Sequence, residues 1–78
     1  MADDRRQIEA WREALKVSPD NVPLRRHLAQ TLYAVGDLTG AEIEFRRALT
    51  HDPDDLGCKL GLARVYLGLG KHDVGLVL

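Results

Sequence analysis

Three histidines and a single cysteine are the side chains in this sequence best suited to bind a metal ion: His27, His51, Cys58 and His72. Zinc sites usually take closely spaced pairs of such residues, because several ligands must converge on one ion. Here the residues fall in separate predicted helices or turns, and no C-x-x-C or H-x-x-x-H pair is present. We therefore expect no metal site. Cys58 is expected to pack in the interior, and His51 to lie on the surface near a helix end.

Two segments resemble ion-binding or phosphate-binding loops only in part. Residues 52–57 begin like a calcium loop, but Leu56 occupies a ligand position and Ala63 stands where a bidentate glutamate is required. Residues 68–73 contain two glycines and a lysine, but lack the last glycine and the Ser or Thr of the phosphate-loop patterns. We interpret the first segment as a turn with helix-capping carboxylates, and expect no cofactor.

No combination of nucleophile, base and acid indicates an enzyme. The sequence has no nucleophile elbow, and no Ser, His and Asp that its spacing would bring together. Glu42 and Glu44 are expected on a solvated helix face, where Arg46 and Arg47 can pair with them. The Arg-Arg doublets form no stripe that could follow a phosphate backbone, because neighbours on a helix diverge by about 100°.

The composition favours one small helical domain in a reducing compartment. The chain has 78 residues, of which 45% are hydrophobic and only 5% aromatic, so the core must be aliphatic and rich in alanine. A net charge of -1 without a polybasic tail argues against nucleic acid as a partner. No signal peptide or bilayer-spanning run is recognisable, and one cysteine allows no internal disulfide. A cytoplasmic protein is expected.

Apolar residues recur every three or four positions, which predicts amphipathic helices over about 3–16, 22–35, 38–50 and 56–69, with a fifth starting at His72. Ala14 and Val35 are expected on the inward faces. Asn21 is a candidate N-cap, and Gly36 a candidate left-handed residue at a helix end.

The helices repeat with a period of 34 residues. Eight pairs match at this spacing: Pro19 and Pro53, Trp11 and Phe45, Ala14 and Ala48, Leu15 and Leu49, Leu28 and Leu62, Ala29 and Ala63, Leu32 and Tyr66, Gly36 and Gly70. Two helices per unit at this period are the signature of the tetratricopeptide repeat. A unit of this kind buries its apolar surface only by stacking against its neighbours.

The sequence resembles the tetratricopeptide repeat (TPR) family at the positions of its small and large packing residues: Leu28, Ala29, Leu32, Gly36, Ala41, Phe45, Ala48 and Pro53. The resemblance implies an all-α solenoid of antiparallel helix pairs, as one domain over 1–78. Residues 3–21 would form the second helix of a partial repeat, 22–55 a complete repeat, and 56–78 the first helix and the start of the second helix of another. Arg25 and Lys59, where the family often has Trp, and Glu42, where it prefers an aliphatic residue, depart from the pattern.

The resemblance also implies a function. The first helix of each pair in such arrays lines a concave groove, which here would contain Arg26, Gln30, Tyr33, Ala34, Leu60, Arg64 and Leu67. An extended or helical peptide with apolar anchors and an acidic group would suit it. We expect a non-catalytic protein-interaction module. The alternative is an accessory segment of a larger enzyme, such as an ATPase, with its chemistry beyond residue 78.

The last residues of the sequence are apolar, whereas helical arrays need a polar outer face on their last repeat. This suggests that the chain is a fragment of a longer protein, or that copies associate through Leu76, Val77 and Leu78. A short natural protein with a frayed tail is the remaining alternative.

Overall fold

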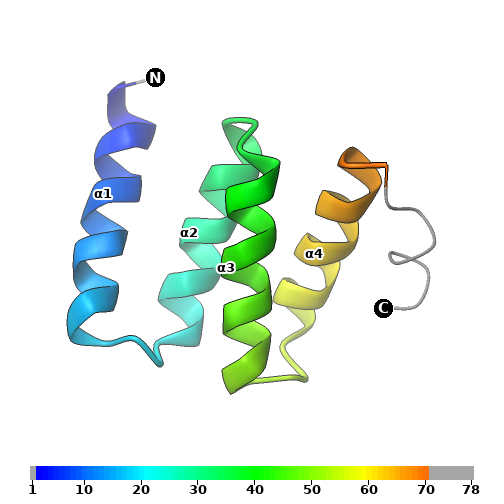
Figure 1. Ribbon diagram of the computed structural model, residues 1–78. Helices are drawn as coiled ribbons and strands as arrows, with labels where there is room; N and C mark the ends of the chain where they lie inside the picture. The colour runs from blue at the N-terminus through cyan, green and yellow to red at the C-terminus, as the bar shows by residue number, and fades with distance from the viewer. Residues whose placement is uncertain (1, 71–78) are drawn as a thin grey trace.

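The computed structural model describes residues 2–70 and shows four helices joined by short turns (Figure 1). They are α1 (Ala2–Val17), α2 (Val22–Ala34), α3 (Leu38–His51) and α4 (Leu56–Gly68). Each runs antiparallel to the one before it, and no strand is present in the described part of the chain. The predicted all-α class is confirmed, with helix ends within one or two residues of expectation. The expected fifth helix and Leu76, Val77 and Leu78 lie outside the described residues.

Three of the helices begin at a capping side chain. The side-chain oxygens of Asn21, Asp37 and Asp55 accept hydrogen bonds from the backbone N–H groups three residues ahead, at 3.1, 2.9 and 2.9 Å. These bonds satisfy donors that the first turn of a helix leaves without a partner. At the other end of α2, Gly36 has φ +91°, the left-handed conformation predicted for it. The turns between helices therefore lie where the sequence has capping side chains and a glycine in the left-handed conformation.

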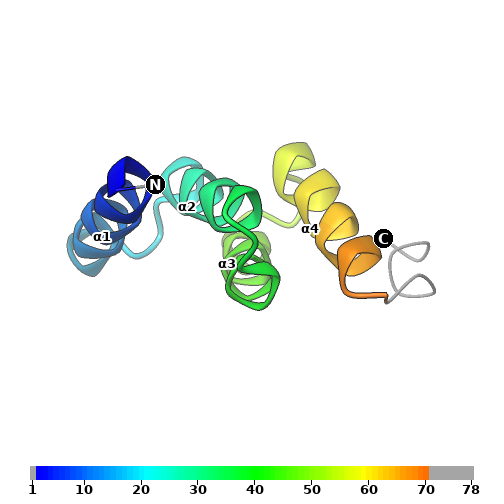
Figure 2. The same ribbon diagram turned by 90° about the horizontal axis from the view of Figure 1, so that it is seen from above.

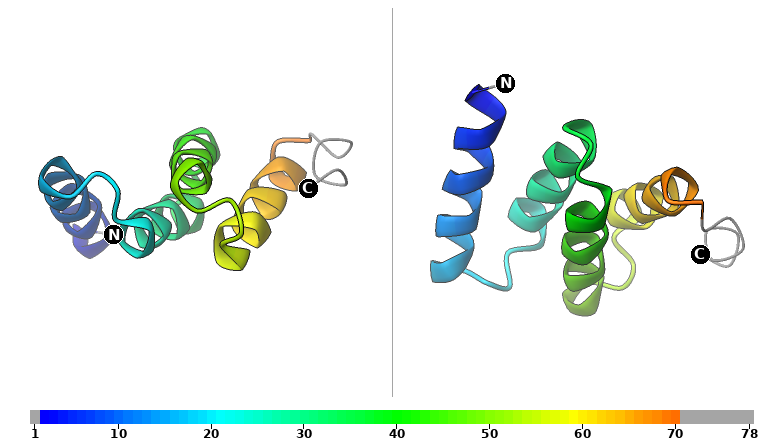
Figure 3. Two further views of the ribbon diagram at one scale, coloured as in Figure 1. Left: turned by 90° about the horizontal axis from the view of Figure 1, so that it is seen from below. Right: turned by 45° about the horizontal axis from the view of Figure 1, so that its top comes forward.

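The helices alternate between two sides of the molecule. Seen from above, α2 and α4 lie on one side and α1 and α3 on the other (Figure 2), and the view from below shows the same zigzag (Figure 3). Helix α2 packs against α1, α3 and α4, and α3 packs against α4, whereas the backbones of α1 and α3 stay apart. This arrangement leaves a groove between α2 and α4 on one side, and another between α1 and α3 on the other.

The core follows the 34-residue repeat. Its buried residues come from all four helices: Leu15, Leu28, Ala29, Leu32, Ala41, Phe45, Ala48, Cys58, Leu62, Val65 and Tyr66. Ala29, Ala41 and Ala48 are fully buried, which lets α2 and α3 approach closely. The Phe45 ring fills the space between α3 and α4, and a Cβ atom on Gly61 would overlap it. Cys58 is buried, as predicted.

Several predicted exposures are wrong. Glu44 is only 4% exposed, and the side chain of Glu42 is 12% exposed, although both were expected on a solvated face. The expected pairs with Arg46 and Arg47 are nevertheless present, at 3.7 and 3.5 Å.

Ala14 and Val35, expected inside, are exposed. Ala48, the counterpart of Ala14, is buried in α3, which packs on the helix before it, whereas no helix precedes α1 in the described residues. Val35 is the C-cap of α2, where the chain turns away from the helix axis. Separately, none of the four helices has the length and hydrophobicity needed to cross a membrane.

Candidate functional site

A cavity of about 390 Å³ opens on the side of the molecule formed by α2 and α4. Its lining residues are Gln30, Tyr33, Phe45, Gly57, Leu60, Gly61 and Arg64. Four of the seven residues predicted for the concave groove therefore surround one space: Gln30, Tyr33, Leu60 and Arg64. The remaining three are Arg26, Ala34 and Leu67, which do not line it.

The helical spacing of these residues explains why they meet. Gln30 and Tyr33 are three residues apart on α2, and Leu60 and Arg64 are four apart on α4, so each pair shares a helix face. Both faces point away from the buried Leu28 and Leu62 stripes. Tyr33 is 38% exposed and Leu60 52% exposed, which is a large apolar surface to leave in water. The cavity thus has two apolar side chains at its mouth and two polar ones beside them.

Sequence reasoning missed the floor of the cavity. Gly57 and Gly61 are also four residues apart, so α4 presents bare backbone there, and the Phe45 ring from α3 lies against Gly61. One repeat earlier the equivalent pair is Trp11 and His27, whose rings stack with centroids 6.1 Å apart. Two glycines at helical spacing beside a groove face were the available signal, because they remove the side chains that would fill this space.

Arg26 makes an intramolecular contact beside this cavity. Its guanidinium donates a hydrogen bond to Asp55, the N-cap of α4, and so links α2 to α4. The missing side chain of Gly57 makes room for it, since a Cβ there would lie 2.8 Å from Arg26 Cδ. The hydrogen bond from the Cys58 backbone N–H lowers the pKa of Asp55 below its ordinary value of 3.8, and Arg26 adds to this against the opposing effect of burial.

Ala34 and Leu67 are exposed near the C-terminal ends of α2 and α4. Leu67 is 53% exposed. Ala34 lies four residues beyond Gln30 and Leu67 three residues beyond Arg64, so each is about one turn beyond a residue that lines the cavity. They extend the same surface toward one end of the two helices.

Of the side chains considered for metal binding, His27, His51 and Cys58 lie in the described part of the chain and His72 lies outside it. Within residues 2–70 no three His, Cys, Asp or Glu side chains are grouped as a metal site would need. Burial raises the pKa of the Cys58 thiol to about 12, so this cysteine is a neutral thiol at physiological pH and a poor nucleophile. His51 lies on the surface in the last turn of α3, as predicted, with Nε2 3.5 Å from an Asp20 oxygen.

Comparison with known proteins agrees with the repeat seen in the sequence and the helices. A tetratricopeptide repeat family profile matches residues 22–65, which cover α2, α3 and most of α4. No curated protein and no solved structure matches the chain significantly. Tetratricopeptide repeats generally mediate protein–protein interactions, and the family is typically non-catalytic. With matching period, packing residues and helix arrangement, the chain belongs to the tetratricopeptide repeat family.

Proposed function

We propose that this protein is a non-catalytic interaction module that binds a peptide segment of another protein in the groove between α2 and α4. The observation that carries the proposal is the cavity of about 390 Å³ at which Tyr33, Leu60 and Arg64 meet. Partly exposed aromatic and aliphatic side chains around a concave site are typical anchors for a protein ligand. A cytoplasmic location is part of the proposal and is supported by the single, buried cysteine.

The chemistry of the cavity selects the kind of peptide. An apolar side chain of the ligand would enter between Tyr33 and Leu60 and rest on the Phe45 ring. Arg64 is exposed and makes no ion pair with any described residue, whereas Arg26 is engaged by Asp55. An acidic group next to the apolar anchor would therefore pair with Arg64, with Gln30 available for a backbone hydrogen bond. The expected ligand is a short segment that combines one apolar anchor with one neighbouring carboxylate.

A peptide library tests the proposal. Peptides selected from a random library on the immobilised protein are expected to share this apolar-acidic pair. The selected peptide should bind Tyr33→Ala or Leu60→Ala at least tenfold more weakly by isothermal titration calorimetry, because each variant removes a central anchor surface. Both side chains are partly exposed, so the fold should be retained.

Ile43→Ala is the matched control, since Ile43 is 44% exposed on α3 and does not line this cavity. It should bind like the wild type. Selected peptides that bind Tyr33→Ala and Leu60→Ala as tightly as the wild-type protein would refute this groove as the binding site.

A further inference from the structure

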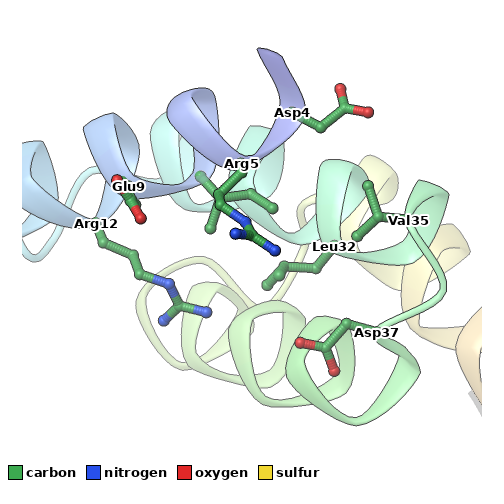
Figure 4. Close-up of a pocket in the computed structure, with 8 residues that line it drawn as sticks. Asp4, Arg5, Glu9, Arg12, Leu32, Val35 and Asp37 are labelled. Carbon is green, nitrogen blue, oxygen red and sulfur yellow. The ribbon is translucent and has the colours of Figure 1, made fainter. Parts of the chain in front are cut away.

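The opposite side of the molecule carries a second groove, between α1 and α3, with α2 as its floor. Two cavities of about 630 and 300 Å³ lie along it, and both are lined by Arg12. Figure 4 shows the larger one, where Arg5 and Arg12 extend from α1, with Leu32 and Val35 of α2 alongside and Asp37 at the start of α3. The groove is open because α1 and α3 both pack on α2 while their own backbones stay apart.

At the smaller cavity, three arginines from three helices converge on one carboxylate. Arg25 of α2 donates a hydrogen bond to Glu44 Oε1 at 2.7 Å. Arg47 of α3 lies 3.5 Å and Arg12 of α1 3.9 Å from Glu44 Oε2. Arg25 and Glu44 are buried, whereas the side chains of Arg12 and Arg47 are 48% and 62% exposed. The charge surplus therefore faces solvent at the mouth of the cavity.

Most hydrogen-bond donors of Arg12 and Arg47 have no partner among the residues that the structure describes. Arg12 reaches Glu44 only at ion-pair distance, and Arg47 makes one hydrogen bond at the long limit. A single carboxylate cannot balance three guanidinium groups, and its strongest contact is with the buried Arg25. Lys16 also lines the cavity, but its amine is 2.9 Å from Glu13. Arg12 and Arg47 are thus placed to share a second, external carboxylate.

The rest of the groove indicates whether this carboxylate belongs to a small molecule or to a polypeptide. Beyond Arg12 the lining includes the apolar side chains of Ile8, Leu32 and Val35, a surface that suits a polypeptide better than a small ion. In this half the carboxylates of Asp4, Glu9 and Asp37 outnumber the one further cation, Arg5, so an acidic group of the ligand is favoured less there than at Arg12 and Arg47. We propose that this groove binds an acidic segment of a protein partner, with its carboxylates on Arg12 and Arg47 and its apolar residues over Ile8 and Val35. The proposal is independent of the groove between α2 and α4.

Fluorescence anisotropy with the 78-residue chain tests this proposal. The probe is a labelled peptide with three glutamates followed by three leucines, compared with the same peptide carrying glutamines. We expect the glutamate probe to bind about tenfold more tightly than the glutamine probe, as shared charge-assisted hydrogen bonds would give. The Arg12→Gln/Arg47→Gln variant should abolish this preference. The Arg12→Glu/Arg47→Glu variant should prefer a lysine version of the probe.

Controls separate this surface from other arginines. Arg46→Gln, an exposed neighbour that pairs with Glu42, and Tyr33→Ala in the other groove should both keep the preference. Circular dichroism will show whether each variant is folded, and the single variants serve if a double variant is not.

The proposal fails if the Arg12/Arg47 variant retains the preference or if Arg46→Gln removes it equally. It also fails if inorganic phosphate at matched ionic strength displaces the probe completely, because that would indicate a small-anion site.

Discussion

Arg25 and Glu44 connect α2 to α3 through an ion pair whose side chains are 11% and 5% exposed. Arg25 also donates a hydrogen bond to the Pro19 carbonyl at 2.9 Å, while its Nε is buried without a partner. Taking such charges out of water is unfavourable, and their mutual contact must offset that penalty. Removal of one partner of this pair should therefore destabilise the protein more than removal of one partner of the exposed Lys16–Glu13 pair.

Glu44→Ala should destabilise the protein by about 3 kcal/mol, because it leaves the Arg25 charge buried with less compensation. Replacing both partners, as in Arg25→Met/Glu44→Leu, should restore most of this loss, since apolar residues of similar size need no partner. Urea unfolding followed by circular dichroism measures both variants. A double variant as unstable as Glu44→Ala would show that the pair itself contributes net stability.

Asp55 predicts a dependence of stability on acid. The pKa of its carboxyl is lower in the folded protein than the ordinary 3.8, mainly through the Cys58 backbone N–H. The contribution of the ionised carboxyl to folding stability is therefore present above pH 3.8 and is lost as the pH falls through the lower pKa of the folded protein. Asp55→Asn keeps a capping oxygen but does not titrate, so the stability gap between wild type and Asp55→Asn should narrow on acidification. A constant gap from neutral pH to below pH 3 would contradict this.

The buried Arg25–Glu44 pair is hard to predict from the sequence, because arginine and glutamate are usually exposed. Arg25 stands three residues before Leu28 and seven before Leu32, on the inward face of α2, and Glu44 lies between Ala41 and Ala48 on the inward face of α3. When opposite charges lie on the inward faces of consecutive helices, we expect them to pair with each other, because an unpaired buried charge is unfavourable. The capping role of Asn21 and the left-handed Gly36, in contrast, follow from local backbone chemistry and were predicted correctly.

At the scale of elements, the joint between α3 and α4 depends on one ring. Phe45 is 1% exposed, and it lies against Gly61 of the neighbouring repeat. Its counterpart Trp11 is only partly buried and stacks on His27. The two joints therefore use the same positions, but the glycine allows closer approach of an aromatic ring to the helix backbone.

Phe45→Ala should destabilise the protein by about 3–5 kcal/mol, since it removes a large buried ring and leaves a cavity. This is comparable with the whole stability of a chain of this size, roughly 5 kcal/mol. A thermal melt should show a largely unfolded variant at room temperature, while Ile43→Ala should melt like the wild type. A cooperative Phe45→Ala transition within a few degrees of the wild type would contradict the repeat packing.

Helix positions were predictable because each helix carries its own apolar periodicity and its own end signals. The exposure of residues at the ends of the array was harder to predict, because it depends on which helices pack beside them, and the periodicity does not identify those helices. Ala14 has the same place in its repeat as Ala48, yet only Ala48 has a preceding helix packed on it in the described residues. The floor of the cavity also depends on the packing of separate helices, because Phe45 comes from α3 and Gly61 from α4.

At the scale of the whole molecule, alternation of the helices gives two faces of different character. The groove between α2 and α4 has Tyr33 and Leu60 at its mouth, together with Arg64, which makes no ion pair within residues 2–70. The groove between α1 and α3 carries the arginine cluster around Glu44. A short array of this kind exposes a surface on each side while its apolar residues hold the helices together.

The most direct test of the proposed function is a map of backbone amide NMR shifts during titration with a library-selected peptide. We predict that the changes will concentrate at Tyr33, Leu60, Gly61 and Arg64, around the cavity between α2 and α4. The amides of Ile43 and other exposed residues on α3 should remain unchanged. Tight binding that leaves the amides around the cavity unshifted would contradict the account.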